Sequence, residues 1–384
     1  MSTFAIKADT FFLPTGTVRG GYLMVEDGRF GAHLGPDAEP ACDAVDLSGK
    51  SVAPGFVDTH IHGYADCDVM DCSWESVRTI ADRILENGVT SWLPTTLTAT
   101  TEQLEDACRV IGEHAHENTG ARIQGIFLEG PFFTEKHKGA QNPAYLCAPS
   151  IEKLERWQEA AHGLVKKIAV APEYEGAPEF TEAATKMGVV VALGHSDATC
   201  VEALRCLTAG AQVFVHTYNG MSGLHHREPG MVGAALATRD SYSELICDGH
   251  HVNPMAARVV VNAKGYDHTA LITDCMCAGG MPDGEYKLGE LPVIVEGGTA
   301  RLIDGGSLAG SILRLDQAVR NVIAWGVASP EEAIRMATEV PARANGIDDV
   351  CGSIRPGRDA DFVVLDGDFN VAATYLGGEK VYEA

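Results

Sequence analysis

The residues best suited to chemistry in this chain stand where short apolar runs end. Eight such runs recur, and six of them end in, or lead directly into, a residue that can bind a metal ion or move a proton. Those residues are found in Asp58–His62, Glu129–Pro131, His195–Ser196, His216, Asp248–His251 and Asp274. Strand ends that converge on one face of a (β/α)8 barrel form the active sites of that fold, so residues far apart in sequence are expected to meet. The pattern predicts a metal-dependent hydrolase.

His60 and His62 stand two residues apart in the first of these runs. On a strand this spacing turns both side chains to the same face, so two imidazole nitrogens would approach one side of a cation. A lone His-x-His pair is weak evidence for a metal site. Here the pair ends the segment Pro54–Gly63, directly after a region of short strands, and this setting strengthens the prediction that both histidines are metal ligands.

Glu129, His195 and His216 each follow an apolar run in the same way. A carboxylate at the end of a buried strand is costly to desolvate unless it meets a cation or a hydrogen-bond donor. The alternative is that Glu129 caps a loop and that each histidine is a hydrogen-bonded core residue. Core packing alone explains poorly why four histidines and one glutamate stand at equivalent strand ends, so we expect all five to bind metal.

Asp274 ends the run Leu271–Thr273 and has no basic neighbour in the sequence. We expect it to act as general base toward a metal-bound water and then as general acid toward the leaving group. The metal would lower the pKa of that water toward ~7 and polarise the scissile carbonyl. The alternatives for Asp274 are a further metal ligand and the N-cap of the next turn.

The elements that must position these residues alternate between strand and helix from Pro54 to Ile347. Strands are expected at 56–62, 91–94, 124–128, 167–171, 189–193, 212–215, 244–247 and 270–273. Helices are expected at 74–86, 101–114, 197–208, 311–325 and 330–344. This α/β pattern predicts a (β/α)8 TIM barrel over residues 54–345. An open doubly wound sheet usually carries a Gly-rich turn after its first strand, whereas this chain has His-Ile-His-Gly there.

Both ends of the chain consist of short strand patterns separated by turn residues. The strands are expected at 4–6, 21–25 and 44–47, and again at 352–354, 360–365 and 380–382. We predict that residues 1–53 and 346–384 pair into one small β-sandwich domain, with the barrel inserted between them.

Composition and charge exclude several classes of protein. The 384 residues are 45% hydrophobic and 21% charged, which is ordinary for a globular enzyme. A formal net charge of -24 argues against nucleic acid and against anionic membrane surfaces as partners. We find no secretory signal and no apolar run of the ~20 residues that span a bilayer.

The cysteines bear on the cellular compartment. The 11 cysteines show no paired framework, so free thiols in a reducing cytoplasm are expected. Cys275 and Cys277 flank the predicted site, and their spacing is unlike that of a zinc knuckle. This favours small loop or core residues over metal ligands.

Ordered motifs along almost the whole chain resemble those of the amidohydrolase superfamily and, within it, of the N-acetylglucosamine-6-phosphate deacetylases. They are Pro54–Asp58, Leu128–Phe132, Gly194–Ser196, His216–Asn219, Met221, Arg227, Asp248–Val252, Thr273–Asp274 and Ser307–Ser311. The resemblance implies hydrolysis of the acetamide of N-acetylglucosamine 6-phosphate. It also implies that Glu129, His195 and His216 hold a divalent metal and that Asp274 is the acid and base.

Two further expectations concern the metal. Some family members lack ligands on the first strand and keep one ion, so His60 and His62 here favour two ions bridged by Glu129. We expect zinc, with iron, cobalt or manganese as alternatives, because imidazole and carboxylate ligands suit all four. Other amidohydrolase branches bridge their metals with a carbamylated lysine at a strand end, and Glu129 takes that place here.

The resemblance also implies a sugar-phosphate substrate and the residues that hold it. They are Asn219, Gly220, Arg227 and His251 near the phosphate, and Ala140, Gln141, Leu308, Ala309 and Gly310 along the sugar. A guanidinium can bind two phosphate oxygens at once. In the family this arginine crosses a dimer interface, so a homodimer is expected. Without the resemblance, His225-His226-Arg227 would be interpreted as a solvated loop.

The sequence departs from the family at four positions. Tyr218, Gly220 and Cys275 stand where Phe, Ala and Ala are usual, and Gln141 replaces a common histidine. Such changes could shift the preference toward the galactosamine epimer without altering the chemistry. Two alternatives are another amidohydrolase reaction on a small amide and a non-catalytic sugar-phosphate sensor. The sensor is disfavoured because every predicted ligand and Asp274 are retained.

Overall fold

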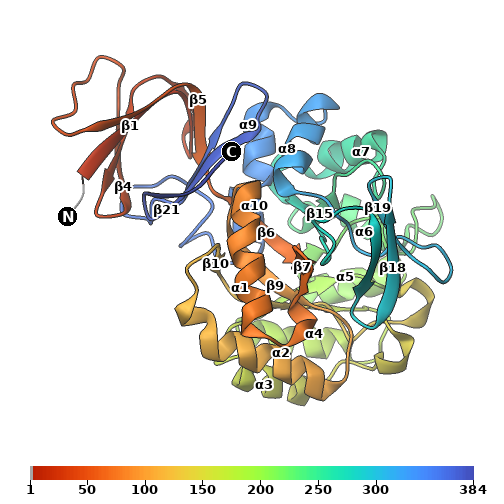
Figure 1. Cartoon of the computed structure of the whole chain (residues 1–384). Helices are drawn as coiled ribbons and strands as arrows, with labels where there is room; N and C mark the ends of the chain where they lie inside the picture. The colour runs from red at the N-terminus through yellow and green to blue at the C-terminus, as the bar shows by residue number, and fades with distance from the viewer. Residues whose placement is uncertain (1–2) are drawn as a thin grey trace.

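The computed structural model describes residues 3–384 and confirms the (β/α)8 barrel (Figure 1). Its parallel strands follow one another in chain order around the ring. They are β6 (Phe56–Ile61), β9 (Val89–Thr96), β11 (Ile126–Leu128), β12 (Val165–Val170), β13 (Val190–Leu193), β14 (Val213–Phe214), β15 (Tyr242–Ile246) and β16 (Thr269–Ile272), with β10 (Arg122–Ile123) beside β9. The ring closes where the N–H of Asp274 donates to the carbonyl oxygen of His60 (2.8 Å) and where Ile61 bridges Cys275.

The barrel strands are buried on both faces, which explains why they appear in the sequence as nearly continuous apolar runs. All residues of β9 are buried, for example. Phe127 and Ala169 pack with residues of neighbouring strands in one cluster, while Ile126 and Leu128 belong to a different cluster that includes the helices. Because side chains alternate along a strand, Lys167 shares the face of Ala169 and points into the barrel.

Helices surround the barrel, as Figure 1 shows. They are α1 (Trp74–Arg83), α2 (Thr101–His114), α3 (Ile151–Ala160), α4 (Ala177–Lys186), α5 (Cys200–Thr208), α6 (Gly230–Ala237), α7 (Pro254–Lys264), α8 (Leu315–Ala324), α9 (Pro330–Met336) and α10 (Glu339–Ala344). Thr100, Thr199 and Ser329 begin α2, α5 and α9 with reciprocal capping boxes. Across residues 3–384, no helix is long and apolar enough to cross a membrane.

Strands from both ends of the chain form one eight-stranded sheet. They are β1 (Thr3–Leu13), β2 (Gly16–Arg19), β3 (Tyr22–Glu26), β4 (Arg29–Leu34), β5 (Ala44–Pro54), β20 (Phe362–Leu365), β21 (Val371–Leu376) and β22 (Glu379–Glu383). The sheet order runs β22-β21-β20-β5-β1-β3-β4, yet Phe30 on β4 and Phe362 on β20 have ring centroids 6.2 Å apart. The sheet therefore curls over its own core, which also holds Ile354.

Some of the sequence predictions about elements are wrong or incomplete. No strand forms at Gly352–Ile354, where Ile354 fills the terminal core from a loop. The helix expected at 330–344 is two helices, because the chain breaks at Thr338 (φ -135°, ψ -86°). A three-stranded antiparallel sheet between β16 and α8 was not predicted; it consists of β17 (Gly284–Leu288), β18 (Leu291–Glu296) and β19 (Thr299–Leu302). A short hairpin, β7 (Gly63–Tyr64) and β8 (Cys67–Asp68), follows β6.

Candidate active site

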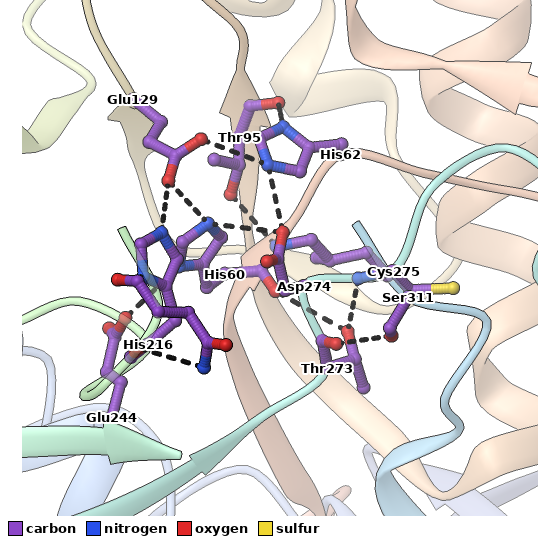
Figure 2. Close-up of polar contacts among 12 residues, drawn as sticks. His60, His62, Thr95, Glu129, His216, Glu244, Thr273, Asp274, Cys275 and Ser311 are labelled. Carbon is purple, nitrogen blue, oxygen red and sulfur yellow. Dashed lines mark hydrogen bonds and ion pairs between the residues drawn. The ribbon is translucent and has the colours of Figure 1, made fainter. Parts of the chain in front are cut away.

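The predicted metal ligands and Asp274 meet at the carboxyl ends of the barrel strands, and Figure 2 labels all of them except His195. His60 and His62 come from the end of β6, and Glu129 directly follows β11. His195, His216 and Asp274 follow β13, β14 and β16. Five of these six residues line a cavity of about 150 Å³, which we call the central cavity, and His60 is fully buried beside them. The convergence expected from sequence is thus present in the fold.

Glu129 is the hub of this cluster. Its Oε1 lies 3.0 Å from Nε2 of His216, 3.2 Å from Nε2 of His195 and 3.3 Å from Nε2 of His60. Its Oε2 lies 3.3 Å from Nε2 of His62. One carboxylate therefore faces all four imidazoles, with its two oxygens divided between them.

Asp274 contacts two of these four histidines. Its Oδ1 lies 3.2 Å from Nε2 of His62 and 3.5 Å from Nε2 of His60. Asp274 also lines the central cavity, so its carboxylate adjoins both the ligand cluster and the space open to a substrate.

Each of the four histidines uses its other nitrogen to contact an acceptor outside the cluster. Nδ1 of His62 lies 3.2 Å from the carbonyl oxygen of Thr95. Nδ1 of His195 lies 3.0 Å from the carbonyl oxygen of His137, and Nδ1 of His216 lies 3.0 Å from that of Asn219. Nδ1 of His60 lies 3.1 Å from Oε2 of Glu244. A proton on each Nδ1 directs the lone pair of each Nε2 into the cluster, which is the arrangement of metal-binding histidines.

These residues fit a divalent metal centre. Nε2 of His195 and Nε2 of His216 lie 3.1 Å apart, so two lone pairs would repel unless a proton or a cation lies between them. Nε2 of His60 is buried without a hydrogen-bond partner. Two groups of ligand atoms are close enough to share an ion: His60, His62 and Asp274, and His60, Glu129 and His216. Nitrogen and carboxylate donors of this kind suit zinc and the neighbouring first-row metals.

In this cluster, burial and the neighbouring charges shift the pKa values of the residues in opposite directions. Burial favours neutral imidazole, but Asp274 and Glu129 outweigh it and raise the pKa of His60 to about 9. The same balance raises the pKa of His62 to about 10. Burial also disfavours the ionised carboxylates, yet His60 and its neighbours lower the pKa of Asp274 to about 2 and hold the pKa of Glu129 well below its usual range. Without a metal, the positive charge of protonated histidines takes the place of the cation.

The backbone at three of these strand ends adopts the left-handed conformation. The φ angles are 45° at His195, 28° at His216 and 51° at Asp274. Non-glycine residues rarely adopt such angles, and where they do the strain is often held at functional sites. Gly194 permits the chain before His195 to pack closely against Val215, because a Cβ at position 194 would lie 2.1 Å from Cγ2 of Val215.

Most of the predicted substrate residues line the central cavity as well. These residues are Ala140, Gln141, Asn219, Gly220, His251, Leu308 and Gly310. Ala309 is fully buried and its N–H donates to the carbonyl oxygen of Ala300 (3.1 Å), so only its neighbours face the cavity. Arg227 lies in an exposed loop, where its guanidinium contacts Nε2 of His226 at 2.8 Å. The structure therefore does not bring Arg227 into this cavity.

Gln141 and His251 are each held by a specific contact. Nε2 of Gln141 donates to Oε2 of Glu129 (2.8 Å), and its Oε1 accepts from the N–H of Thr98 (2.9 Å). Gln141 therefore buttresses the central carboxylate. Nδ1 of His251 lies 2.7 Å from Oδ2 of Asp248. Burial raises the pKa of Asp248, but hydrogen bonds from His251 outweigh it and lower that pKa.

Two of the departures from the family pattern have a structural explanation. Gly220 has φ +60°, and a Cβ there would lie 3.0 Å from Nδ1 of His195. The hydroxyl of Tyr218 donates to the carbonyl oxygen of Ala256 (3.1 Å). Cys275, another of the departures, is fully buried, and Cys277 beside it is buried too, as expected for core residues.

Sequence reasoning missed the residues that support the ligands from inside the barrel. Glu244 contacts His60 and Lys167, and both Glu244 and Lys167 are buried. A signal was present, because charged residues inside otherwise apolar parallel strands are unusual. Both residues were expected only as the first positions of strands.

Comparison with known proteins places this geometry in a family. The Amidohydrolase family model matches residues 51–282 and 293–381. An N-acetylglucosamine-6-phosphate deacetylase from Vibrio furnissii is 40% identical over 94% of this chain and 90% of its own length. The chain belongs to the amidohydrolase family.

Relatives that match over nearly their whole length point to one group within this family. An N-acetylgalactosamine-6-phosphate deacetylase from Escherichia coli O157:H7 is also 40% identical, over 95% of this chain and 99% of its own length. A mutant of N-acetyl-D-glucosamine-6-phosphate deacetylase from Mycobacterium smegmatis, solved with N-acetyl-D-glucosamine-6-phosphate, matches with a TM-score of 0.95 at 31% identity over 99% of this chain and 100% of that chain. These relatives are deacetylases of N-acetyl amino-sugar 6-phosphates.

Proposed function

We propose that this chain is a metal-dependent deacetylase that hydrolyses the acetamide of N-acetyl-D-glucosamine 6-phosphate to D-glucosamine 6-phosphate and acetate, in the breakdown of amino sugars. One observation carries the proposal: four imidazole Nε2 atoms, Glu129 and Asp274 converge on one cavity at the carboxyl ends of the strands. Relatives that match the chain over nearly its whole length carry this activity in their names.

The residues of the cluster suggest how the reaction proceeds. A divalent ion held by Glu129, His195 and His216 would polarise the acetamide carbonyl and lower the pKa of an attacking water. Asp274 accepts a proton from that water as its oxygen attacks the carbonyl carbon. The same carboxyl group then donates the proton to the amine nitrogen as the C–N bond breaks. The contact of Asp274 with His62 fixes its carboxylate toward the cavity.

The metal content is part of the proposal. We place one ion on Glu129, His195 and His216 and a second on His60 and His62, with Glu129 bridging them and zinc as the native metal. Support comes from Glu129, whose Oε1 faces His195, His216 and His60 and whose Oε2 faces His62, and from the two groups of ligand atoms close enough to share an ion. Metal analysis of protein purified without chelator should give two equivalents, and a single equivalent at saturating metal would contradict the second site.

The phosphate requires positive groups that the overall charge of -24 does not supply. We propose that Asn219, Gly220 and His251 bind it together with Arg227 of a second subunit, so that the active enzyme is a homodimer in the cytoplasm. The exposed loop that carries Arg227 is compatible with contact to another copy of the chain. The free state of all 11 cysteines supports a reducing compartment.

A second candidate is N-acetylgalactosamine 6-phosphate. The relative that acts on it by name is as similar to this chain as the first glucosamine relative. The chemistry at the acetamide is the same for both sugars. The two differ at one hydroxyl, so the contacts along the sugar decide between them.

The test is acetate release from four compounds: both N-acetylhexosamine 6-phosphates and both unphosphorylated sugars. We expect fastest turnover of N-acetylglucosamine 6-phosphate. Faster turnover of the galactosamine epimer would favour the second candidate, and equal rates with unphosphorylated sugars would remove the phosphate site. No acetate from any of the four, with metal bound, would contradict the proposed function.

A further inference from the structure

Lys167 and Glu244 are buried charges to which the proposed reaction assigns no role. Lys167 is 0% exposed and Glu244 is 1% exposed. The cost of desolvating a buried ion pair is often larger than the attraction between its charges, so such pairs are poor sources of stability. Their place in the barrel interior, next to a metal ligand, indicates another purpose.

Glu244 joins the buried lysine to His60. Its Oε1 contacts Nζ of Lys167, and its Oε2 lies 3.1 Å from Nδ1 of His60. Nζ of Lys167 also lies 3.9 Å from the centroid of the Phe127 ring, and that ring meets the His60 ring at 88° with centroids 4.9 Å apart. The imidazole is therefore fixed by a hydrogen bond at one nitrogen and by packing against Phe127 on its ring.

His60 differs from the other three histidines of the cluster in the acceptor for its Nδ1. The other three use backbone carbonyl oxygens, whereas His60 uses a carboxylate. A carboxylate partner keeps the Nδ1 proton in place and makes Nε2 a stronger electron donor to a metal. Nε2 of His60 has no hydrogen-bond partner of its own.

Lys167 completes this arrangement. A lone Glu244 carboxylate in the barrel interior would be an uncompensated buried charge, which is strongly unfavourable. The ammonium of Lys167 compensates it and fixes the rotation of the carboxylate, so that Oε2 stays aimed at His60.

We propose that Lys167 and Glu244 are positioning residues that hold His60 as a ligand and thereby determine how tightly the ion on His60 and His62 binds. The inference rests on the two-ion centre proposed above. It assigns no contact with substrate to either residue, so metal binding alone tests it, independently of the substrate.

The first variant removes the pair without leaving a buried charge: Lys167→Met together with Glu244→Leu. Zinc and cobalt binding are measured by competition with a chromophoric chelator, and bound equivalents by metal analysis after dialysis. We expect one equivalent to bind about 10- to 100-fold more weakly, as when other hydrogen-bond partners of metal ligands are removed. The other equivalent, on Glu129, His195 and His216, should be unchanged.

The rescue variant is Lys167→Met together with Glu244→Gln, in which the amide oxygen can still accept from Nδ1 of His60. We expect it to recover a large part of the lost affinity. The matched control is Lys264→Met, which removes the buried lysine at the end of α7; this lysine contacts the carbonyl oxygen of Thr238 and Oγ of Ser241 (2.8 Å). It should lower the melting temperature and leave both metal affinities unchanged.

Several outcomes would overturn the inference. The first is wild-type metal affinity in the folded double variant that carries Glu244→Leu. The second is an equal loss of metal affinity in the double variants with Glu244→Leu and with Glu244→Gln. The third is a comparable loss of metal affinity in Lys264→Met. A wild-type protein that binds only one equivalent would overturn it too. Wild-type protein that binds two equivalents but releases no acetate would contradict the proposed function and leave this inference standing.

Discussion

Asp274 is the residue on which the proposed chemistry depends most. We expect Asp274→Asn to lower kcat by about 10²- to 10⁴-fold, because an amide cannot accept the proton of the attacking water. The metal content should be retained, since Glu129 and the histidines remain. Steady-state kinetics and metal analysis on the same preparation check both parts. Near-normal turnover would remove Asp274 from its assigned role, and loss of metal would make it a ligand instead.

His60 and His62 predict a pH dependence of metal binding. With pKa values of about 9 and about 10 in the metal-free protein, raised from 6.5, both imidazoles carry a proton on Nε2 at pH 7. A metal must displace those protons, so its apparent affinity should rise with pH until about pH 10. Zinc added to metal-free protein at pH 7 in weak buffer should therefore acidify the solution. Binding without proton release would contradict these pKa shifts.

The same pKa shifts determine whether the stability of the metal-free protein rises or falls with pH. A histidine whose pKa is raised on folding contributes stability that is full below pH 6.5 and is lost as pH rises through the folded-state values of about 9 and about 10. We expect the melting temperature of metal-free protein to fall over that upper range. Zinc-loaded protein serves as the comparison, because there the ion replaces the protons.

At the scale of elements, the β17–β18 turn and the loop that carries Ala140 and Gln141 are tied together. Glu290 accepts from Nδ2 of Asn142 (2.9 Å) and from the hydroxyl of Tyr145 (3.1 Å). Glu290 thereby helps to hold the loop whose Ala140 and Gln141 line the central cavity, so Glu290→Ala should weaken substrate access and raise KM with little change in kcat. The expected rise is about two- to five-fold, because exposed contacts of this kind contribute at most ~1 kcal/mol. Glu285→Ala, another exposed glutamate of the hairpin, is the control. A kcat effect larger than the KM effect would contradict a role confined to substrate access.

The barrel strands and the positions of the candidate ligands were predictable because a buried parallel strand leaves a local apolar run and the residues at or just beyond its end face the site. The helix at 101–114 was predictable in full, since Thr100 and Gln103 form a local capping box. Contacts between distant segments were not. The bond from Gln141 to Glu129 and the pairing of Lys167 with Glu244 depend on how separate elements meet in space. The division of domains at residues 53/54 and 345/346 stays a prediction.

At the scale of the whole molecule, Arg227 is the predicted phosphate contact that the single chain leaves outside the central cavity. If it serves the partner's site, Arg227→Ala should raise KM for the phosphorylated sugar by about 10- to 100-fold, as expected for lost charged hydrogen bonds. Turnover of the unphosphorylated sugar should hardly change.

Mixing Arg227→Ala with Asp274→Asn tests the exchange between subunits. After unfolding and refolding together, half of the dimers are mixed, and each mixed dimer has one site with both residues intact. Assayed with phosphorylated sugar at a concentration below the wild-type KM, where each variant alone is slow, the mixture should show roughly a quarter of wild-type activity. If Arg227 served its own subunit, no activity would return. Size-exclusion chromatography with light scattering provides the accompanying measure of the dimer.

The pairing of β5 with β20 also has a consequence during synthesis of the chain. Val52 on β5 pairs with Val364 on β20, about three hundred residues later. At the ~5–20 residues per second of a ribosome, roughly 15–60 s pass between the two. In that interval β1 to β5 emerge with an open edge while the barrel strands are still being made. The barrel should therefore fold before the terminal sheet is complete. The strands β20 to β22 join the sheet last, after β1 to β5 have been exposed for the longest time.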